Sequence, residues 1–488
     1  MGADRGGLPE GRARHSVDTR SEGIGPGGFE RNGVDRVPEG DRTSTPGTFF
    51  VVFVGGSVGL GAIAFGWVAM TFGLGLWATI SAVAVGTVVG QILLVPLILI
   101  GSKTATNNAT SSGATFGVRG RIIGSGIGLL TTLVSVALTV WTSGSAGAAA
   151  AGRLFGWPDT PLVEGIGYAL VAIVSVAVAI WGFRWLVRAT TIVFVLGGLV
   201  MILMPFAFGG GIKWDYAGGQ YLLGDFWPTW LLVATTIGVA GALVVCTILG
   251  DWTRYIRSDL HSSSKLAWIG SLGIFLGFVV PAAIGAIVTT AVTDPQAPFT
   301  VSVANESPTW YAVLLLPFAV FGGVGLVAQS LYSAGLDLEA LVVRLTRAQS
   351  TVVIAVVGVV LMYLGLLSAV QASIAAALLI MAELSAPWAV IVGIGYLRSH
   401  GRYDQDDLQV FNRRETGGRY WYSGGWRWQA ALAWAVGSVI GLLMIQTQLF
   451  MGPLSGIAGG VDVSLIAASV VAGVLYLVLT PHQDAPAF

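Results

Sequence analysis

The sequence predicts an all-α polytopic membrane protein with twelve transmembrane helices, and three observations lead to this fold class. First, the 488 residues are 54% hydrophobic and only 10% charged, whereas soluble domains carry about 25% charged residues. Second, the apolar runs are of the ~20-residue length needed to cross a ~30 Å hydrocarbon core. Third, 23 of the 25 Lys and Arg residues fall on one side when these runs are threaded back and forth.

The twelve runs are spread over most of the chain and are separated by polar loops. They lie near residues 48–73, 76–101, 120–150, 162–182, 186–209, 228–250, 266–291, 310–334, 350–370, 372–397, 428–448 and 461–480. An even number of spans places both termini on the same side. Cytoplasmic loops carry the excess of Lys and Arg, and only Arg153 and Lys213 fall on the other side. We therefore expect a multi-pass plasma-membrane protein with both termini in the cytoplasm.

The first 47 residues differ from the rest of the chain. They contain eleven Gly and four Pro with almost no apolar clusters, which predicts a disordered cytoplasmic tail that cannot bury a core. This tail has no apolar stretch of the kind found in signal peptides, so we expect no cleavage. The predicted organisation is a disordered tail, a transporter core, a cytoplasmic loop, two further spans and a short cytoplasmic C-terminal tail, at 1–47, 48–397, 398–427, 428–480 and 481–488.

Net charge and cysteine content narrow the set of partners. The formal net charge is zero, which gives no reason to expect nucleic acid as a partner. The lone Cys246 has no mate for an internal disulfide. We expect the lipid bilayer and a small-molecule substrate as partners, with no cofactor and no metal.

Glycine clusters predict where the helices are interrupted. The first span carries Gly55, Gly56, Gly59 and Gly61, and the sixth carries Gly238 and Gly241 with Gly250 at its end. Transporters bind substrate where two helices at corresponding positions of an inverted repeat are broken. Breaks five spans apart indicate a five-plus-five inverted repeat with broken helices 1 and 6, followed by two C-terminal helices. The alternative is that these glycines only let neighbouring helices approach closely.

Polar residues at membrane depth are the second guide to a site, because unpaired polar groups in hydrocarbon are costly. Glu383 is the only acid or base predicted to lie far from any span end. It is either a proton carrier or a protonated group bonded to a neighbouring helix. The uncharged polar groups at depth either hydrogen-bond between helices or bind a ligand, and they include Ser57, Thr132, Ser135, Gln329 and Ser330.

A membrane-embedded enzyme would need nucleophiles, acids or metal ligands meeting at one depth. The four histidines are predicted to lie in tails or loops, so catalysis is not expected. A channel would need a filter-like repeat, and none is present in the sequence. A non-transporting sensor stays open as an alternative.

Short segments in order along residues 45–450 carry a family resemblance. They are Gly73–Gly75 with 77–86, Ile100–Thr104, Phe116–Gly120, Gly250–Tyr255, Leu331–Leu336, Pro387-Trp388, Gly401–Tyr403 and Gly425-Trp426. Together they resemble the nucleobase:cation symporter-1 family, of the purine-cytosine permease type. The resemblance implies a cation symporter that imports a nucleobase or a related neutral nitrogen heterocycle, of the cytosine, purine, hydantoin or allantoin class. The alternative is a transporter of the same fold for an amino acid or a vitamin-like compound.

The resemblance also implies a substrate site between spans 1, 3, 6 and 8. Carried onto this sequence, the site comprises Ser57, Gly59, Gly61, Thr132, Ser135, Gly241, Ala242, Gln329 and Ser330. The sequence departs from the family pattern in spans 3, 6 and 8, and Gln329 and Ser330 stand in a span 8 that usually supplies Asn residues. Ser135 stands where relatives offer a stacking Trp, Thr132 stands where they offer an amide, and Ala242 replaces an aromatic residue.

The sequence also leads to expectations for the coupling ion and for a gate at the cytoplasmic end. A sodium site in this fold needs carbonyls from span 1 and hydroxyls from span 8, and the matching Gly325-Leu326 has no hydroxyl. This favours a proton as the coupling cation, with Glu383 as its carrier. Asp251 and Arg254 can face each other on a helical turn, which predicts a structural gate pair at the cytoplasmic end of span 6.

Overall fold

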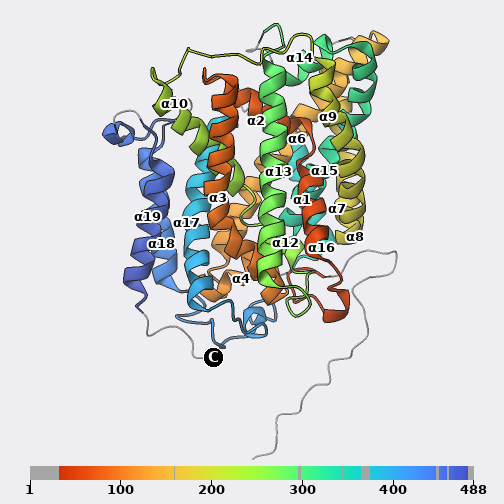
Figure 1. Ribbon diagram of the computed structural model, residues 1–488. Coiled ribbons are helices and arrows are strands. Elements are labelled where there is room, and N and C mark those ends of the chain that lie inside the picture. The colour runs from red at the N-terminus through yellow and green to blue at the C-terminus, as the bar shows by residue number, and fades with distance from the viewer. Residues whose placement is uncertain are drawn as a thin grey trace, which may run out of the picture.

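The computed structural model describes residues 32–158, 160–294, 298–342, 344–363, 374–446, 450–458 and 461–481. Within these ranges the regular elements are all helices, and strand pairing is limited to isolated bridges. The all-α fold class is therefore confirmed (Figure 1). Residues 1–31 of the predicted disordered tail and residues 482–488 of the predicted C-terminal tail lie outside the described residues.

The first five spans follow the predicted order. Span 1 is split into α1 (Pro46–Ser57) and α2 (Leu60–Met70), and span 2 is α3 (Leu76–Thr104). Span 3 is α6 (Ile122–Phe155) and span 4 is α7 (Pro161–Trp181). Span 5 is continuous through α8 (Phe183–Ile192), the π-helix η2 (Val193–Gly197) and α9 (Gly198–Ala207). Short helices α4 (Asn108–Ser111) and α5 (Gly113–Phe116) fill the loop between spans 2 and 3.

Spans 6 to 10 also follow the predicted order, and two further spans come after them. Span 6 comprises α10 (Phe226–Val233), the π-helix η3 (Ala234–Val239), α11 (Ala240–Leu243) and α12 (Leu249–Thr253). Spans 7 to 10 are α13 (Ser263–Thr289), α15 (Thr309–Leu341), α16 (Arg347–Tyr363) and α17 (Ile374–Arg398), with α14 (Phe299–Glu306) before span 8. Spans 11 and 12 are α18 (Trp428–Met444) and α19 (Ser464–Leu479).

Length and hydropathy support the membrane assignment. Among the described residues, eight helices are long and apolar enough to cross a membrane, and the bent pair α1 and α2 makes up to nine. Three shorter apolar helices occupy the other predicted positions, at Arg347–Val360, Trp428–Met444 and Ser464–Leu479. The positions of all twelve predicted runs are thus occupied by apolar helical segments.

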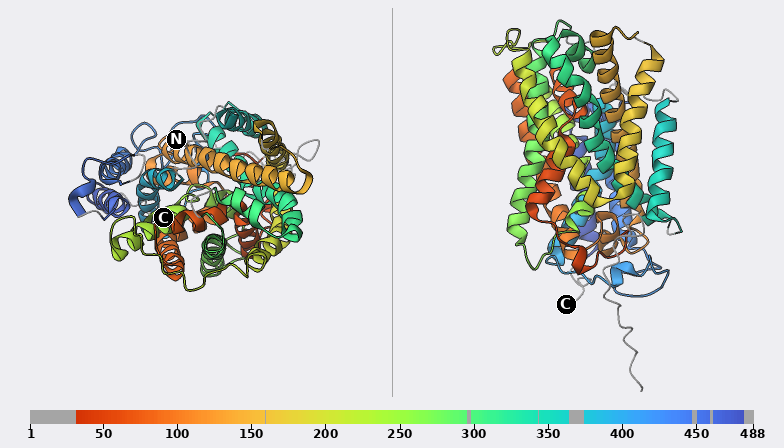
Figure 2. Two further views of the ribbon diagram at one scale, coloured as in Figure 1. Left: turned by 90° about the horizontal axis from the view of Figure 1, so that it is seen from above. Right: turned by 90° about the vertical axis from the view of Figure 1, so that its right-hand side faces the viewer.

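The helices pack into a core of ten spans with a peripheral pair. The long helices α6 and α15 pack along each other, and α13 packs against α1, α2 and α3. Helices α18 and α19 pack on each other and on α17, and they lie at one edge of the molecule when it is seen from above (Figure 2). The two extra helices therefore stand outside the inverted repeat, as predicted.

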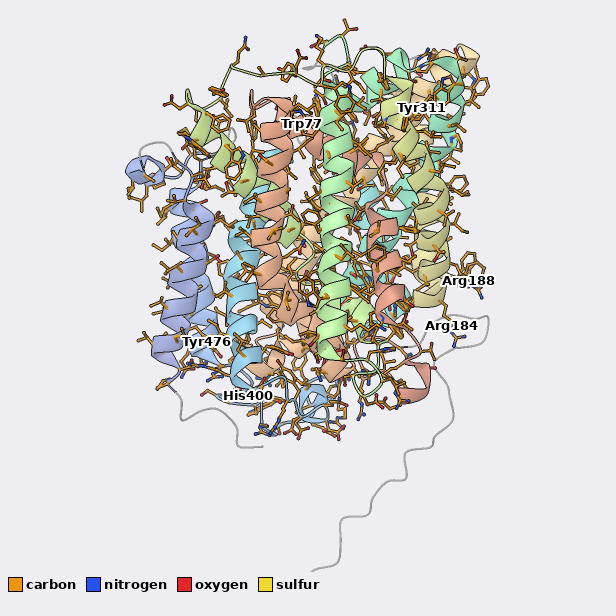
Figure 3. All side chains as sticks on the ribbon, viewed as in Figure 1. Trp77, Arg184, Arg188, Tyr311, His400 and Tyr476 are labelled. Atoms are coloured by element: carbon orange, nitrogen blue, oxygen red, sulfur yellow. The ribbon has the colours of Figure 1, made fainter. Side chains whose placement is uncertain are left out.

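Charged and aromatic residues mark the two ends of the bundle. Arg184, Arg188 and His400 lie toward one end, and Trp77 and Tyr311 lie toward the other (Figure 3). The first end carries the loops that follow spans 2, 4, 6, 8 and 10, and we call it the predicted cytoplasmic end. The aromatic side chains at the opposite end are typical of a membrane interface.

Glycines allow close helix crossings. A Cβ on Gly66 of α2 would overlap the carbonyl oxygen of Ala282 of α13, and a Cβ on Gly285 would overlap that of Ile63. Similarly, a Cβ on Gly238 would lie 2.6 Å from the Cα of Gly86 in α3. At these crossings the glycines let neighbouring helices approach closely, which was the alternative interpretation of the glycine clusters.

Replacing Gly285 by alanine should destabilise the protein, because its Cβ meets a backbone carbonyl that no side-chain rotation can move. We expect a loss of about 1–3 kcal/mol, the usual cost of overpacking. The measurement is the thermal unfolding midpoint of purified protein in detergent. Gly198→Ala is the matched control, since nothing lies within 4 Å of its added Cβ. Equal midpoints for the two variants would show that the α2–α13 crossing is looser than described.

A segment before α1, residues 32–45, packs against the predicted cytoplasmic end, and we call it the N-terminal strap. Val37 and Arg42 are buried. The amide of Val37 donates to Ala105 O at 2.9 Å, and the amide of Ser44 donates to Tyr255 O at 3.0 Å. The strap therefore belongs to the folded bundle, although the sequence predicts disorder up to residue 47, and α1 begins at Pro46.

Candidate functional site

Span 1 is interrupted at the predicted place. Helix α1 ends at Ser57 and α2 begins at Leu60, with a bend of 63° between them. Gly59 adopts an extended backbone at the break, so the helical hydrogen-bond ladder stops there and leaves backbone polar groups for other partners. Irregular backbone at membrane depth is tolerated only where protein or a water-filled cavity surrounds it.

Span 6 is also interrupted, but not at the predicted glycines. Gly238 lies in the π-helix η3 and Gly241 lies in α11, and the helix is interrupted at residues 244–248, which form turns between α11 and α12. The prediction mistook a close crossing with α3 for a break, because glycine serves both purposes. Cys246 lies in this turn, and its carbonyl accepts a hydrogen bond from Asn108 Nδ2 of α4 at 3.0 Å.

The structure brings several predicted site residues together at the break of span 1. The side chain of Gln329 from α15 packs on Gly56, and its amide donates to the carbonyl of Val52. Gly59 faces Gly322 of α15, and a Cβ on Gly61 would lie 3.4 Å from Thr142 Oγ1 of α6. Spans 1, 3 and 8 thus meet where the resemblance places the site.

The other predicted site residues bond within their own helix or are buried in the bundle. Ser57 donates to Phe53 O at 3.0 Å, and Ser135 donates to Thr131 O at 2.9 Å, so both hydroxyls are bound to their own helix. Ala242 is fully buried and packs on Gly90 of α3. Thr132 and Ser330 are buried in α6 and α15.

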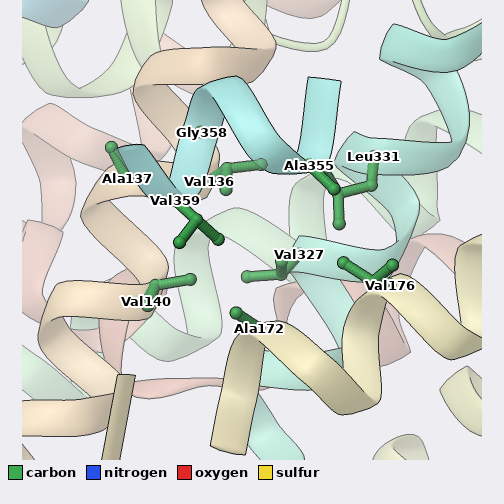
Figure 4. A pocket seen from close by; sticks show the side chains of 10 residues that line it. All are labelled: Val136, Ala137, Val140, Ala172, Val176, Val327, Leu331, Ala355, Gly358 and Val359. Atoms are coloured by element: carbon green, nitrogen blue, oxygen red, sulfur yellow. The ribbon is translucent and has the colours of Figure 1, made fainter. Parts of the chain in front are cut away.

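One face of α15 is purely apolar. Val327 and Leu331, which flank Gln329 and Ser330, line a cavity of about 10 Å³ between α6, α7, α15 and α16 (Figure 4). The cavity has room for about one water molecule and is lined by Val, Ala, Leu and Gly only. A polar ligand therefore has no partner on this face, whereas Gln329 is directed to span 1.

An aromatic pair that was not predicted lies between spans 1 and 7. The rings of Phe65 in α2 and Phe278 in α13 are stacked, with centroids 5.4 Å apart and planes 13° apart. The predicted site residue Gly241 packs directly on the ring of Phe278. Single phenylalanines in apolar runs carry no sequence signal, so only the fold shows that these two meet beside span 6.

The predicted gate residues lie at the end of span 6 beneath the strap. Arg254 is fully buried. Its guanidinium donates to the carbonyls of Gly33 and Asn32 and, at 2.9 Å, to the hydroxyl of Tyr332 in α15. Asp251 is 1% exposed and interacts electrostatically with Arg254. The pair thus sits in a buried polar network that joins span 6, span 8 and the strap.

A second buried carboxyl near this network was missed. The sequence-derived end of span 8 at residue 334 left Asp337 outside the membrane, but α15 continues to Leu341. Asp337 is 2% exposed and packs on Gly128 of α6. Among the described residues its Oδ2 and the Oδ1 of Asp251 have no hydrogen-bond partner. Glu383 is therefore not the only carboxyl buried within a span, and the longer helix is the reason.

Glu383 lies apart from the breaks, against the peripheral helices. Its carboxylate packs on Gly441 of α18, and Oε1 lies 2.7 Å from Ser464 Oγ at the start of α19. The same hydroxyl lies 2.5 Å from Asp462 Oδ1. A hydroxyl donates only one proton, so Ser464 can donate to only one of these two carboxyl groups.

Comparisons with known proteins agree with this architecture. The sequence model of a family described as "Permease for cytosine/purines, uracil, thiamine, allantoin" matches residues 36–466. The chain belongs to this family. It is therefore a multi-pass membrane transporter and not an enzyme, and the family resemblance seen in the sequence is confirmed.

Individual relatives of the permease are distant. It is 22% identical over 475 residues to the putative purine-cytosine permease YxlA of Bacillus subtilis (strain 168), covering 92% of this chain and 95% of the relative. A structure of Mhp1, a nucleobase-cation-symport-1 family transporter in a closed conformation with bromovinylhydantoin bound, matches with a TM-score of 0.72 at 19% identity, covering 92% of this chain and 94% of Mhp1. A Na⁺-coupled sialic acid symporter, solved substrate-bound and outward-open, matches with a TM-score of 0.59 at 12% identity, covering 90% of each chain. At these identities the two structures show the fold alone.

Proposed function

We propose that the permease is a secondary active symporter that imports a nucleobase or a related neutral nitrogen heterocycle through the plasma membrane, with both termini in the cytoplasm. The observation that carries the proposal is the meeting of spans 1, 3 and 8 at the Gly59 break, in a fold in which span 6 is also interrupted. Broken helices present unpaired backbone groups at the midplane. Gln329, whose amide donates to the Val52 carbonyl near the break, and the stacked rings of Phe65 and Phe278 are polar and aromatic groups of the kind that line small-molecule sites.

We propose a proton as the coupling cation. A Cβ on Gly325 of α15 would lie 2.9 Å from the carbonyl oxygen of Gly55 in α1. This is the contact at which a sodium site of this fold would combine a span 1 carbonyl with a span 8 hydroxyl, and glycine supplies no hydroxyl. A hard cation would lack that oxygen ligand here.

Two buried groups are candidates for the proton carrier. Glu383 is the sequence-derived candidate, but it faces spans 11 and 12. Asp337 lies where spans 3 and 8 meet and interacts electrostatically with Asp251. A pair of neighbouring buried carboxyl groups suits a proton carrier, because ionising both together is costly. Its place on α15, the helix that brings Gln329 to the break of span 1, favours it.

Uptake by a permease-deficient host tests both parts of the proposal. We expect accumulation of at least one compound among radiolabelled cytosine, adenine, hypoxanthine, uracil, hydantoin and allantoin. A protonophore should abolish the accumulation, and replacing sodium by choline should leave it unchanged. No uptake of any of these compounds would reject the substrate class. Accumulation that needs sodium and resists the protonophore would reject proton coupling.

A further inference from the structure

A cavity of about 600 Å³ lies at the predicted cytoplasmic end, away from the substrate site. It is formed by the end of α17, the end of α19 and the loop between spans 10 and 11, and His400 and Tyr476 mark its place in Figure 3. Its volume is in the range typical of small-molecule sites. Nothing in the transport proposal uses it.

The charged groups that line the cavity are basic. Arg398, Arg402, Arg427 and His400 line it, and no Asp or Glu is among its described lining residues. The acids on the neighbouring turn are occupied by backbone amides: Asp404 Oδ1 accepts from Asp406 N and Asp407 N at 3.1 and 3.0 Å, and Asp407 Oδ2 accepts from Arg419 N at 2.7 Å. The described lining of the cavity therefore carries its formal charge on arginines, and the carboxyl groups of the neighbouring turn are bonded to backbone amides.

The walls of the cavity are held in place by buried groups. Arg427 is 9% exposed and donates to the hydroxyl of Tyr476 at 3.3 Å, and Arg398 donates to Thr480 O at 2.7 Å. Tyr422 and His400 have positive φ angles of 42° and 53°. Such conformations cost free energy in residues other than glycine and cluster at functional sites.

Apolar side chains form the rim toward the lipid. Leu397 of α17 and Leu477 of α19 line the cavity and are 66% and 46% exposed. Val474 and Val478 continue this exposed apolar surface along α19. A ligand with a charged head and apolar chains fits this arrangement, because its chains can lie on α17 and α19 while its head reaches the arginines.

We propose that this cavity binds the phosphate headgroup of an anionic phospholipid. Arginine forks are suited to phosphate oxygens, and basic pockets between helices on the cytoplasmic side of a membrane accept such headgroups. Lipid binding in this cavity does not depend on which solute is transported, so its test is independent of the test of the proposed function. The bound headgroup would bridge Arg398 at the end of α17, Arg402 in the loop after it and Arg427 just before α18, while the chains lie on α17 and α19.

The test uses purified, delipidated full-length protein and two readouts, bound lipid by native mass spectrometry and the thermal unfolding midpoint. Phosphatidylglycerol is the probe, phosphatidylcholine is the zwitterionic comparison, and inorganic phosphate and glycerol phosphate form a separate arm. Arg402→Gln is the variant, because no hydrogen bond of its side chain is described. Arg184→Gln is the matched control, an exposed arginine at the same end outside the cavity.

Phosphatidylglycerol should bind to and stabilise the wild type and the control equally, and phosphatidylcholine should do neither. Arg402→Gln should weaken the binding about fivefold, the effect of one basic residue near an anionic lipid surface. Equal binding by the two variants, or equal effects of the two lipids, would overturn the proposal. Full stabilisation by inorganic phosphate with no further gain from phosphatidylglycerol would assign the cavity to a soluble anion and also overturn it.

Discussion

Replacing Arg42 by glutamine is expected to open the predicted cytoplasmic end and to expose Cys246. Arg42 is 5% exposed and donates to three carbonyls, those of Ser102 at 2.6 Å, Ile256 at 2.7 Å and Arg254 at 3.0 Å. These bonds tie the strap to the ends of spans 2 and 6. Hydrogen bonds from a charged donor contribute about 1.5–3 kcal/mol each.

If the closed state loses about 3 kcal/mol of stability, the ratio of open to closed protein rises roughly 150-fold. Cys246 is the only cysteine in the chain and is 1% exposed in the interrupted part of span 6, so it is a native reporter. The measurement is the rate of alkylation by a maleimide supplied at the predicted cytoplasmic side of inside-out vesicles. Uptake should fall in parallel, because the closed state is needed to start the cycle.

Arg36→Gln is the matched control, since Arg36 lies on the same strap but is exposed and pairs with Glu39 at 3.5 Å. An exposed ion pair contributes little, so its labelling rate should stay at the wild-type value. If Arg42→Gln labels no faster than Arg36→Gln, the strap does not control this end. Cys246→Ser gives the background of the assay.

Asp337→Asn is expected to abolish accumulation against a gradient while binding and exchange of substrate persist. One proton moving through about 100 mV supplies about 2.3 kcal/mol, which supports about 50-fold accumulation. The amide keeps the size of the side chain at Gly128 but holds no transferable proton. The measurements are the steady-state accumulation ratio and the rate of exchange in preloaded proteoliposomes.

Glu383→Gln is the comparison for this experiment. We expect it to retain accumulation, because Glu383 contacts α18 and α19 and not the interrupted helices. An accumulation ratio near one for Glu383→Gln, with a normal ratio for Asp337→Asn, would reverse the assignment and return the coupling to the sequence-derived candidate. Loss of exchange in either variant would indicate damage to the substrate site instead.

Span order and the break in span 1 could be predicted from the sequence because both rest on local signals. Apolar runs separated by basic loops give the order, and clustered glycines weaken helix 1 where it breaks. The break in span 6 was placed too early because Gly238 serves a helix crossing, which depends on a residue far away in the sequence. Asp337 was missed for a related reason, since the end of α15 is set by packing against α6 and not by its hydropathy.

The candidate site could be predicted only in outline. Gln329 was a candidate because it is a polar residue at predicted membrane depth. The fold shows that its partner is the carbonyl of Val52, 277 residues away. Phe65 and Phe278 had no distinguishing local pattern. The ordered strap was missed because its composition is that of a flexible tail. It is ordered because its residues hydrogen-bond to carbonyls of loops that follow it in the sequence.

The strap has a consequence for biogenesis. Residues 32–45 leave the ribosome before span 1, yet Asn412 Nδ2 contacts Val34 O across 378 residues of sequence, and Thr106 Oγ1 donates to the same carbonyl. The strap can therefore begin to dock once spans 2 and 6 have been made, but it completes its contacts only after the loop that carries Asn412 has followed span 10. Full resistance of the strap to protease would then report that a newly made chain has assembled at least as far as this loop.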